Sequence, residues 1–382
     1  MKKCKHFISA LASFLFVATI LFFTSCKKEN QGDRLMESQS LAKKINPRQG
    51  FVYTESNDAS QNSILSYFQN SNGTLEFSGT TASGGKGSGA SLGSQGALAI
   101  DDSHHWLFAV NAGSNSVSSF SIDENGGLTL AHTVSSNGTL PVSVTVHGNF
   151  LYVVNSTSAN ISGFTIGGDG TLTLIAGSSQ PLSAATAAPA QISFKPGGQY
   201  LVVTEKMTNK ITTFPVNGSG VAGVGSSITS ANATPFGFDF SGSYAIVTEA
   251  AGGAPNASTV SSYWIGGASS VVSGPVQADQ TAACWVDVTA DGKYAYVTNT
   301  GSNTISSFSI NNDGTVQILG EVAATTGGAP LDITLSGNEF YLYNINGTSH
   351  SISEFKKGNN TSLKSIGEVA GLPAVAAGLV AF

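Results

Sequence analysis

The sequence predicts an all-β fold, a seven-bladed β-propeller with four-stranded blades. Two observations lead to this prediction. An apolar strand ending in Asn or Glu recurs seven times, and each copy is followed by a polar turn, a Ser/Thr-rich strand, a Gly turn and a further strand. The steps between the terminal Asn or Glu residues are 56, 44, 50, 44, 50 and 45 residues, which suits the period of a propeller blade.

Two strands of each unit can be placed directly on the sequence. Hairpin turns such as Asn72-Gly73, Asp169-Gly170 and Asp313-Gly314 supply the positive φ angles that tight hairpins need after the second of these strands. The first strands are FVYTE (51–55), LFAVN (107–111), LYVVN (151–155), LVVTE (201–205), AIVTE (245–249), AYVTN (295–299) and YLYN (341–344). The Ser/Thr-rich strands are SILSYF, SVSSFSI, NISGFTI, KITTFPV, TVSSYWI, TISSFSI and SISEF.

A further apolar strand precedes six of the seven copies and should be the innermost strand of its blade. The first copy has no such strand, whereas residues 373–382 resemble one with nothing after it. We therefore expect the C-terminal strand to complete the N-terminal blade, three strands plus one, which removes exposed sheet edges. The leading strands are ALAIDDS (97–103), VSVTVHG (142–148), AQISFKPG (190–197), FGFDFSG (236–242), WVDVTADG (285–292) and LDITLSG (331–337).

The N-terminus is typical of an exported lipoprotein. A basic start is followed by an apolar stretch and by Thr24-Ser25-Cys26, so residues 1–25 are predicted to be a signal peptide and Cys26 the lipidated residue. An uncleaved membrane helix over residues 7–25 is the alternative. Residues 26–49 are predicted to be a flexible tether and residues 50–382 the propeller. Either interpretation places the propeller in the bacterial cell envelope, periplasm-facing or on the surface, with the membrane as a partner.

The charge distribution excludes a nucleic-acid partner. Residues 1–50 hold 9 basic and 3 acidic side chains, whereas residues 51–382 hold 8 Lys, no Arg and 20 acidic side chains. Binding along a phosphate backbone needs clustered Lys or Arg, which the body lacks. After Cys26 the only cysteine is Cys284, so no disulfide is expected within the body, which we expect to be monomeric.

The copy Tyr296-Val297-Thr298-Asn299 matches the YVTN signature of a propeller-repeat family. Residues 50–382 resemble the lactonase-type seven-bladed propellers, which include relatives of 6-phosphogluconolactonase and muconate cycloisomerase. The resemblance implies a site on one face of the ring, with a carboxylate and Arg or His around a lactone. The body departs from that pattern because it has no Arg, and a phosphorylated substrate normally needs Arg or clustered Lys.

The residues that end the seven apolar strands should form a circle at one face, which makes this circle the candidate ligand site. A structural role for all of them is the alternative, because every blade has the feature and Asn is a frequent turn residue. Glu205 and Glu249 lie in consecutive blades and are the candidate catalytic pair, since one carboxylate could act as general base on a water. The candidate ligand-binding residues are Glu55, Asn111, Asn155, Trp285, Asn299 and Asn344.

Other motifs do not indicate a further site. The histidines show no metal-ligand spacing and no cofactor motif is present, so we expect neither a metal nor a cofactor. Residues 84–93 are Gly-rich, but they lack the strand-turn-helix context of a phosphate loop or a nucleophile elbow, and we expect a flexible loop between blades, a potential lid. The aromatic residues at fixed blade positions should form the core between blades.

Two hypotheses for the function follow. The first is a lipid-anchored binding module whose acidic face engages a protein, glycan or small-molecule partner. The second is a lactone hydrolase in which Glu205 or Glu249 activates water against a neutral sugar lactone or an aromatic lactone. The first accounts for the absence of a compact catalytic set in the sequence, and the second for the family resemblance.

Overall fold

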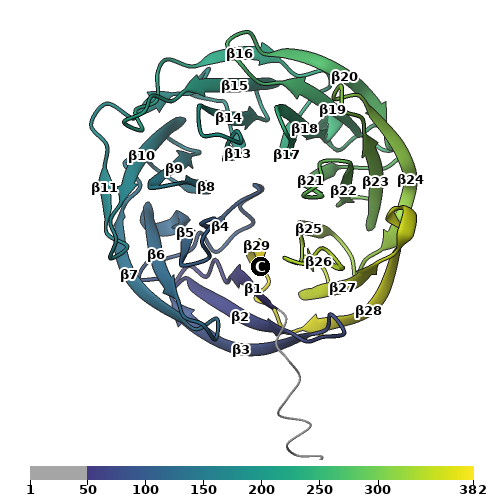
Figure 1. Cartoon of the computed structure of the whole chain (residues 1–382), viewed down its shortest axis with the longest axis horizontal. Helices are drawn as coiled ribbons and strands as arrows, with labels where there is room; N and C mark the ends of the chain where they lie inside the picture. Colours follow the sequence, from purple (N-terminus) through teal and green to yellow (C-terminus); the bar gives the residue numbers. More distant parts are fainter. Residues whose placement is uncertain (1–49) are drawn as a thin grey trace, which may run out of the picture. The chain divides into compact units, whose positions relative to one another are not determined.

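The structure is a computed structural model that describes residues 50–382. In this range seven antiparallel sheets are arranged as blades in a ring around a central axis (Figure 1). Within the described residues there is no α-helix, so the predicted all-β, seven-bladed propeller is confirmed. The predicted signal peptide, Cys26 and tether lie outside the described range.

The innermost strands surround the axis, and each predicted leading strand is found among them. Four of them begin with a proline, whose missing backbone donor is tolerated at a strand start. They are β29 (Ala377–Ala381), β4 (Leu98–Ile100), β8 (Pro141–His147), β13 (Pro189–Phe194), β17 (Pro235–Ser241), β21 (Ala283–Val288) and β25 (Pro330–Leu335).

The second and third strands of each blade are almost wholly buried, because neighbouring blades cover both faces of each sheet. This explains the continuous apolar runs of the second strands. The second strands are β1 (Gly50–Glu55), β5 (Trp106–Asn111), β9 (Phe150–Asn155), β14 (Tyr200–Glu205), β18 (Tyr244–Glu249), β22 (Tyr294–Asn299) and β26 (Tyr341–Asn346). The third strands are β2 (Ser63–Gln69), β6 (Ser116–Ile122), β10 (Asn160–Ile166), β15 (Lys210–Pro215), β19 (Thr259–Trp264), β23 (Thr304–Ile310) and β27 (Ser351–Lys357).

The outer strands form the rim and are largely exposed. They are β3 (Leu75–Ala82), β7 (Leu128–Ser135), β11 (Leu172–Leu174), β16 (Ser226–Thr229), β20 (Ser270–Gln277), β24 (Val316–Thr325) and β28 (Leu363–Ala370). In the third blade a short additional strand, β12 (Gln180–Pro181), also pairs with β10. Three short 3-10 helices lie in loops: η1 (Ala112–Ser114), η2 (Ala251–Gly253) and η3 (Asn359–Thr361).

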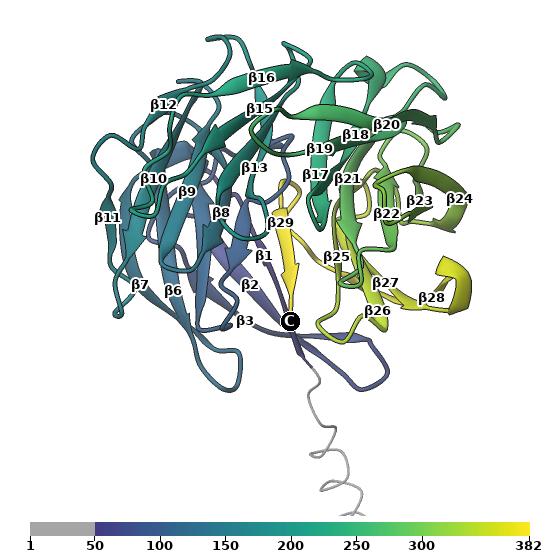
Figure 2. The ribbon, with the colours of Figure 1, turned by 45° about the horizontal axis from the view of Figure 1, so that its top comes forward.

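The ring closes as predicted, through the last strand of the chain. β29 pairs antiparallel with β1, and the blade order is β29-β1-β2-β3 (Figure 2). The backbones of Phe51 and Phe382 exchange hydrogen bonds of 2.9 and 3.1 Å. The N-terminal blade is therefore completed by residues more than three hundred positions later in the sequence.

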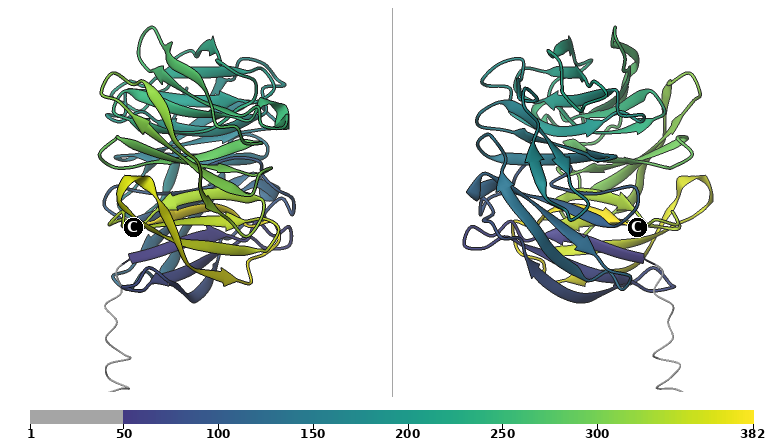
Figure 3. Two further views of the ribbon diagram at one scale, coloured as in Figure 1. Left: turned by 90° about the vertical axis from the view of Figure 1, so that its right-hand side faces the viewer. Right: turned by 60° about the vertical axis from the view of Figure 1, so that its left-hand side comes forward.

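The core is divided among the interfaces between blades. Each hydrophobic cluster combines side chains from adjacent blades, as in the cluster that joins Tyr152 of β9 to Phe214 of β15. The predicted aromatic positions all lie in these clusters and are buried: Phe120, Phe164, Phe214, Tyr263, Phe308 and Phe355. Two side views show the strands of the blades running between the two faces of the ring (Figure 3).

Candidate functional site

The second strands all end at the face where the innermost strands begin. The strand register shows this directly, because Pro189 pairs with Glu205 and Pro235 with Glu249. The segment 84–97, which joins the rim strand β3 to the innermost strand β4, lies at the same face. We call this segment the strap and this side of the ring the strap face.

Glu205 and Glu249 do end their strands at the strap face, but both side chains are fully buried. Each carboxylate accepts four hydrogen bonds, which occupy both of its oxygens. For Glu205 the donors are Ser183 N (3.1 Å), Ser183 Oγ, Thr208 Oγ1 (2.6 Å) and Thr212 Oγ1 (2.6 Å). For Glu249 they are Ser230 Oγ (2.9 Å), Tyr263 OH (2.6 Å), Thr259 Oγ1 (2.6 Å) and Ser261 Oγ (2.8 Å).

These contacts indicate a structural role for the two carboxylates. Hydroxyl groups on the third strand and on the turns point inward and satisfy a buried charge that would otherwise be costly. The two glutamates therefore lie within their own blades and do not share one cavity. A catalytic role for either remains a prediction that would require this network to open.

The asparagines of the circle are also buried, and Asn111 and Asn299 bond to the third strand of their own blade, whereas Asn155 donates to Ser136 O in the loop before its blade (3.2 Å). Asn299 Nδ2 donates to Thr304 Oγ1 (3.1 Å) and Ser306 Oγ (2.8 Å). In the seventh blade the equivalent residue is Asn346, which donates to Ser351 Oγ (2.9 Å) and Ser353 Oγ (2.8 Å), whereas Asn344 lies two residues earlier on β26. Asn111 and Asn155 are likewise fully buried.

Glu55 is buried in the first blade with fewer partners than the other glutamates. Its Oε2 accepts from Asn62 Nδ2 (2.9 Å), while Oε1 has no hydrogen-bond partner. Burial raises its pKa well above the usual value, and the nearby charge of Asp332 adds to this. A protonated Glu55 therefore fits its environment better than a carboxylate.

Trp285 is buried rather than presented to a ligand. Its ring packs on Phe236 with centroids 4.9 Å apart, and its Nε1 donates to the carbonyl oxygen of Ser94 in the strap (2.8 Å). Next to it, Gln95 accepts from Val286 N (3.1 Å) and donates to Val286 O (2.8 Å). Trp285 thus fastens the strap to the sixth blade.

The strap reaches into the ring and bonds to three blades through Ser94 and Gln95. Besides its bonds to the sixth blade, Gln95 N donates to Ala190 O in the fourth blade (3.0 Å), and Ser94 Oγ donates to Val142 O in the third (2.8 Å). Figure 1 shows this segment entering the middle of the ring beside β4. These bonds lie at residues 94 and 95, just beyond the loop expected over 84–93, whose flexibility stays a prediction.

Lys206 is the group at the strap face that sequence reasoning missed. It follows Glu205 directly, its Nζ donates to Gly93 O of the strap, and the ring centroid of Phe236 lies 5.0 Å from Nζ. Burial lowers the pKa of this half-buried amine to about 8. Burial also raises the pKa of the neighbouring Cys284 thiol to about 12. No carboxylate pairs with Lys206 among residues 50–382.

A desolvated amine of this kind can exist uncharged near neutral pH and accept a proton. Lysines that do so occur at catalytic sites, although burial alone also produces such shifts. A lone lysine among eight gives little signal in sequence. The only sequence signal for Lys206 was its position, one residue after a strand that ends at the candidate face.

Three aspartates on consecutive innermost strands also escaped the sequence analysis. Each accepts a backbone N–H from the next blade: Asp239 from Val288 (2.8 Å), Asp287 from Leu335 (2.5 Å) and Asp332 from Gly378 (3.1 Å). Burial raises the pKa of all three, that of Asp332 to about 7, and Asp239 further raises that of Asp287. A polar residue within each apolar leading strand was the available signal.

The family model described as "Lactonase, 7-bladed beta-propeller" matches residues 46–182 and 267–375, well over half of the chain. The chain belongs to this family. The match leaves out residues 183–266, which include Glu205, Lys206 and Glu249. The chain is thus a lactonase-type propeller, while the strands that carry these three residues, β14 and β18, and the turn that holds Lys206 lie in the unmatched part.

Solved structures share the fold of this lactonase-family chain. A candidate 6-phosphogluconolactonase from Bacteroides fragilis has a TM-score of 0.68 at 21% identity, covering 88% of this chain and 99% of that chain. A protein from Lactobacillus plantarum has a TM-score of 0.72 at 20% identity, covering 87% and 99%. The periplasmic gluconolactonase of Pseudomonas aeruginosa has a TM-score of 0.67 at 15% identity, covering 87% and 98%. A comparison with curated proteins gave no match.

The described part of this lactonase-family chain shows no group of three or more His, Cys, Asp or Glu residues placed to hold a metal ion. Over residues 50–382, no helix has the length and apolar character needed to cross a membrane. Cys284, the cysteine in this range, is free and buried.

Proposed function

We propose that this chain hydrolyses an uncharged lactone at the strap face, with Lys206 as the residue that activates water. Family membership supports the reaction class. The observation that supports the site is the Lys206 amine, which lacks a carboxylate partner among the described residues and lies at the face where the strap, Phe236 and Trp285 meet.

The proposed reaction needs one proton acceptor. Uncharged Lys206 takes a proton from water as the water oxygen attacks the lactone carbonyl carbon, which forms a tetrahedral oxyanion. The ring C–O bond then breaks and the resulting ammonium returns the proton to the departing alkoxide. The product is a hydroxy acid, and the amine is regenerated without a cofactor.

The absence of arginine supports an uncharged substrate. Residues 51–382 hold 20 acidic side chains, only 8 Lys and no Arg. A phosphate group would need a bidentate or clustered cationic site. We therefore propose a neutral sugar lactone or an aromatic lactone rather than a phosphorylated one.

A binding module is the second candidate function. The observation in its favour is the saturation of the Glu205 and Glu249 networks, which leaves no assembled acid–base pair at the circle of strand ends. In that case the strap face would engage a protein, glycan or small molecule without chemistry. For either function we propose export and attachment through a lipid at Cys26, on the evidence of the N-terminal sequence alone.

The deciding experiment measures lactone ring opening by the full chain with gluconolactone and a panel of neutral lactones. We expect turnover above the spontaneous rate and a fall of at least about a hundredfold in Lys206→Met, the usual contribution of a general base. Lys210→Met, on the same hairpin, is the matched control and should keep the rate. Unchanged turnover in Lys206→Met would exclude this residue as the base, and no turnover by the parent would favour the binding module.

The same assay tests the glutamates. A Glu205→Gln/Glu249→Gln double variant keeps the shape of both side chains but replaces an accepting oxygen with a donor. If these residues are structural, stability falls while the rate per folded molecule is kept. If the double variant loses lactone turnover but keeps the stability of the parent, Glu205 or Glu249 has a catalytic role.

A further inference from the structure

A lysine lies between two aromatic side chains at the face of the propeller opposite the strap face, where the second strands begin. Lys195 follows β13, and its Nζ lies 5.9 Å from the ring centroid of Tyr200 and 5.3 Å from that of Trp264. Tyr200 begins β14 of the fourth blade, whereas Trp264 ends β19 of the fifth. We call these three residues the Lys195 cluster. The lactonase proposal makes no use of them.

The hairpin of the fifth blade packs differently from those of other blades. In the third blade, a Cβ atom added at the hairpin residue Gly170 would lie 2.3 Å from the ring of Trp106, which begins the second strand of the preceding blade. The hairpins of the first, second, fourth and sixth blades also place a glycine against such a ring. At Gly267 of the fifth blade the nearest atom from another part of the chain would be Tyr200 OH, at 3.7 Å. This hairpin therefore leaves space beside Tyr200, into which Lys195 extends.

Lys195 has no carboxylate partner among residues 50–382. Lys293, at the same face, pairs with Asp291 at 3.3 Å. The Nζ of Lys195 donates instead to the carbonyl oxygen of Ile265 in the hairpin (2.8 Å). Because an ammonium has three N–H donors, two of them remain for a ligand, and no ion pair neutralises the charge.

The surroundings of the cluster favour an anion. The segments 190–204, 242–248 and 250–278 supply the strands and the hairpin around the cluster, and they contain Lys195 as their only charged residue. In the rest of the body acidic side chains outnumber lysines. An anion bound to Lys195 would therefore meet no carboxylate from these segments that repels it.

Two further donors lie beside the same hairpin. A Cβ atom added at Gly266 would lie 3.0 Å from Trp264 Nε1, and one added at Gly267 would lie 3.7 Å from Tyr200 OH. Neither donor makes a hydrogen bond within the described part of the chain. Trp264 is 41% exposed and Tyr200 is half-buried. The cluster thus combines an ammonium, an indole N–H and a phenol O–H around one hairpin, and all three can donate to an anionic ligand.

We infer that the Lys195 cluster binds a uronic acid, a sugar ring that carries a carboxylate. A single cation suits a singly charged carboxylate, whereas a phosphate dianion needs a bidentate or clustered site. The carboxylate would bind Lys195 Nζ, and the donors of Tyr200 and Trp264 would bind oxygen atoms of the sugar. The exposed part of Trp264 would be covered by C–H groups of the sugar ring. The uronic acid can be free or a unit of a polysaccharide, and the test distinguishes these sources.

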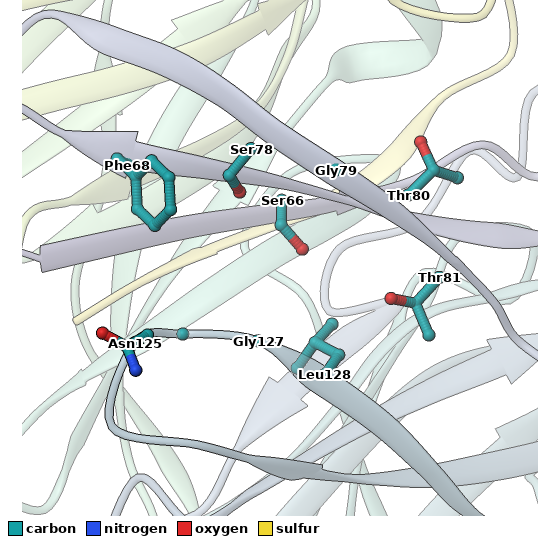
Figure 4. Close-up of a pocket in the computed structure, with 10 residues that line it drawn as sticks. Ser66, Phe68, Ser78, Gly79, Thr80, Thr81, Asn125, Gly127 and Leu128 are labelled. Carbon is teal, nitrogen blue, oxygen red and sulfur yellow. The ribbon is translucent and has the colours of Figure 1, made fainter.

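A hollow of ≈ 350 Å³ on the flank of the propeller is a separate place for a small molecule. It lies between β2 and β3 of the first blade and the β6–β7 hairpin of the second (Figure 4). Its lining residues carry no charge, so it offers no ion pair to a carboxylate. Binding of a neutral compound in this hollow would not depend on Lys195, so substitution of Lys195 distinguishes the two places.

The test is a tryptophan-fluorescence titration of the full chain, because Trp264 is the exposed one of its three tryptophans. The probes are methyl glucuronide, an oligomer of galacturonic acid, neutral methyl glucoside, benzoate and glucose 6-phosphate. We expect saturable binding of both uronates, and binding of the methyl glucoside that is weaker by about tenfold or more because it lacks the carboxylate. Benzoate and glucose 6-phosphate should also bind more weakly. Tighter binding of the oligomer would identify a polysaccharide as the source, and equal binding a free sugar acid.

Lys195→Met removes the charge but keeps an unbranched side chain. It should weaken glucuronide binding about ten- to hundredfold, as expected for one lost hydrogen bond to a charged group. Lys195→Arg keeps the charge and should retain more affinity than Lys195→Met. Lys293→Met is the matched control, since it removes an exposed lysine from the same face, and it should bind like the parent. In the parent, raising the ionic strength should weaken binding of the glucuronide but not of the methyl glucoside.

Three results would overturn the proposal: no saturable binding of either uronate, equal affinity of Lys195→Met and the parent, or tighter binding of benzoate or glucose 6-phosphate than of the uronates. The ionic-strength measurement uses the parent, so it tests the proposal even if Lys195→Met does not fold. Lys195→Met should leave lactone turnover unchanged, and Lys206→Met should leave glucuronide binding unchanged. The two proposals therefore fail separately.

Discussion

Trp285 Nε1 donates a hydrogen bond to Ser94 O across the axis of the ring, at 2.8 Å and over 191 positions of sequence. Blades of a propeller normally contact only their neighbours in the ring. This bond, with those of Gln95, links the segment before the second blade to the sixth blade. The strap therefore adds contacts across the ring to those between adjacent blades.

Removing this bond should lower stability by about 1 kcal/mol, the net contribution of one buried hydrogen bond. Trp285→Phe keeps most of the ring but leaves Ser94 O without this donor. Urea unfolding should show the loss, whereas Trp264→Phe, at a tryptophan that is 41% exposed, should change stability less. Equal effects of the two substitutions would argue against a role for the strap bond.

Gly237 should not tolerate a side chain. A Cβ atom there would lie 2.1 Å from Gln95 Oε1 and 2.6 Å from Cys284 O, so either the strap or β21 would have to move. We expect Gly237→Ala to destabilise the fold by about 1–3 kcal/mol, the usual cost of overpacking. Gly218→Ala, at a site with no atom within 4 Å, is the control. Equal unfolding midpoints for both variants would contradict this account.

Lactone hydrolysis should depend on pH through Lys206. The pKa of this amine is lowered to about 8, and only the uncharged form accepts a proton. After subtraction of the spontaneous rate, kcat/KM should rise with pH and level off above about 8. A profile that stays the same in Lys206→Met would assign the inflection to another group.

Asp332 should make the fold less stable as pH rises. Burial raises its pKa from 3.8 to about 7, so the folded state retains a proton that the unfolded chain loses first. The stabilisation is present below pH ~4 and is lost as pH rises to about 7, by up to about 4 kcal/mol at about 1.4 kcal/mol per pKa unit. Asp332→Asn should therefore flatten the dependence of unfolding free energy on pH over this window.

The Asp332→Asn experiment has a simple control. Asp102 is exposed, and Asp102→Asn should leave the pH dependence of the parent in place. If the unfolding free energy of the parent does not fall between pH 4 and 7, ionisation of Asp332 does not destabilise the folded state.

Membrane attachment should depend on Cys26. If this residue carries a lipid, the parent chain partitions with the membrane fraction and Cys26→Ser stays in the aqueous fraction. Fractionation followed by immunoblotting measures the difference. If both proteins stay with the membrane fraction, a lipid anchor at Cys26 is excluded and the uncleaved apolar helix is favoured.

The architecture could be predicted from sequence because each blade repeats the same local signals. The repeated apolar runs and turns such as Asp313-Gly314 predicted the number of blades, and the missing first leading strand predicted the closure by β29. In the seventh blade the predicted strand YLYN ends at Asn344, two residues before the end of the observed strand. Its next residues, Ile345 and Asn346, continue the strand.

The state of the candidate site could not be predicted in the same way. Glu249 looked available because its partners, Thr259 and Ser261, were recognised only as residues of a Ser/Thr-rich strand. The spacing of these hydroxyls in alternate positions was the signal that they face one acceptor. The course of the strap had no local signal at all, since it depends on contacts such as the one between Ser94 and Trp285.

Because β29 closes the ring, the first blade can be completed only after the C-terminal strand has been synthesised. Until Ala377–Ala381 has left the ribosome, the first blade lacks its innermost strand. The inner edge of β1 then has unpaired backbone groups that invite pairing with other chains. The first blade should thus need protection from such pairing until β29 emerges, and a chain cut before Ala377 could not close the ring.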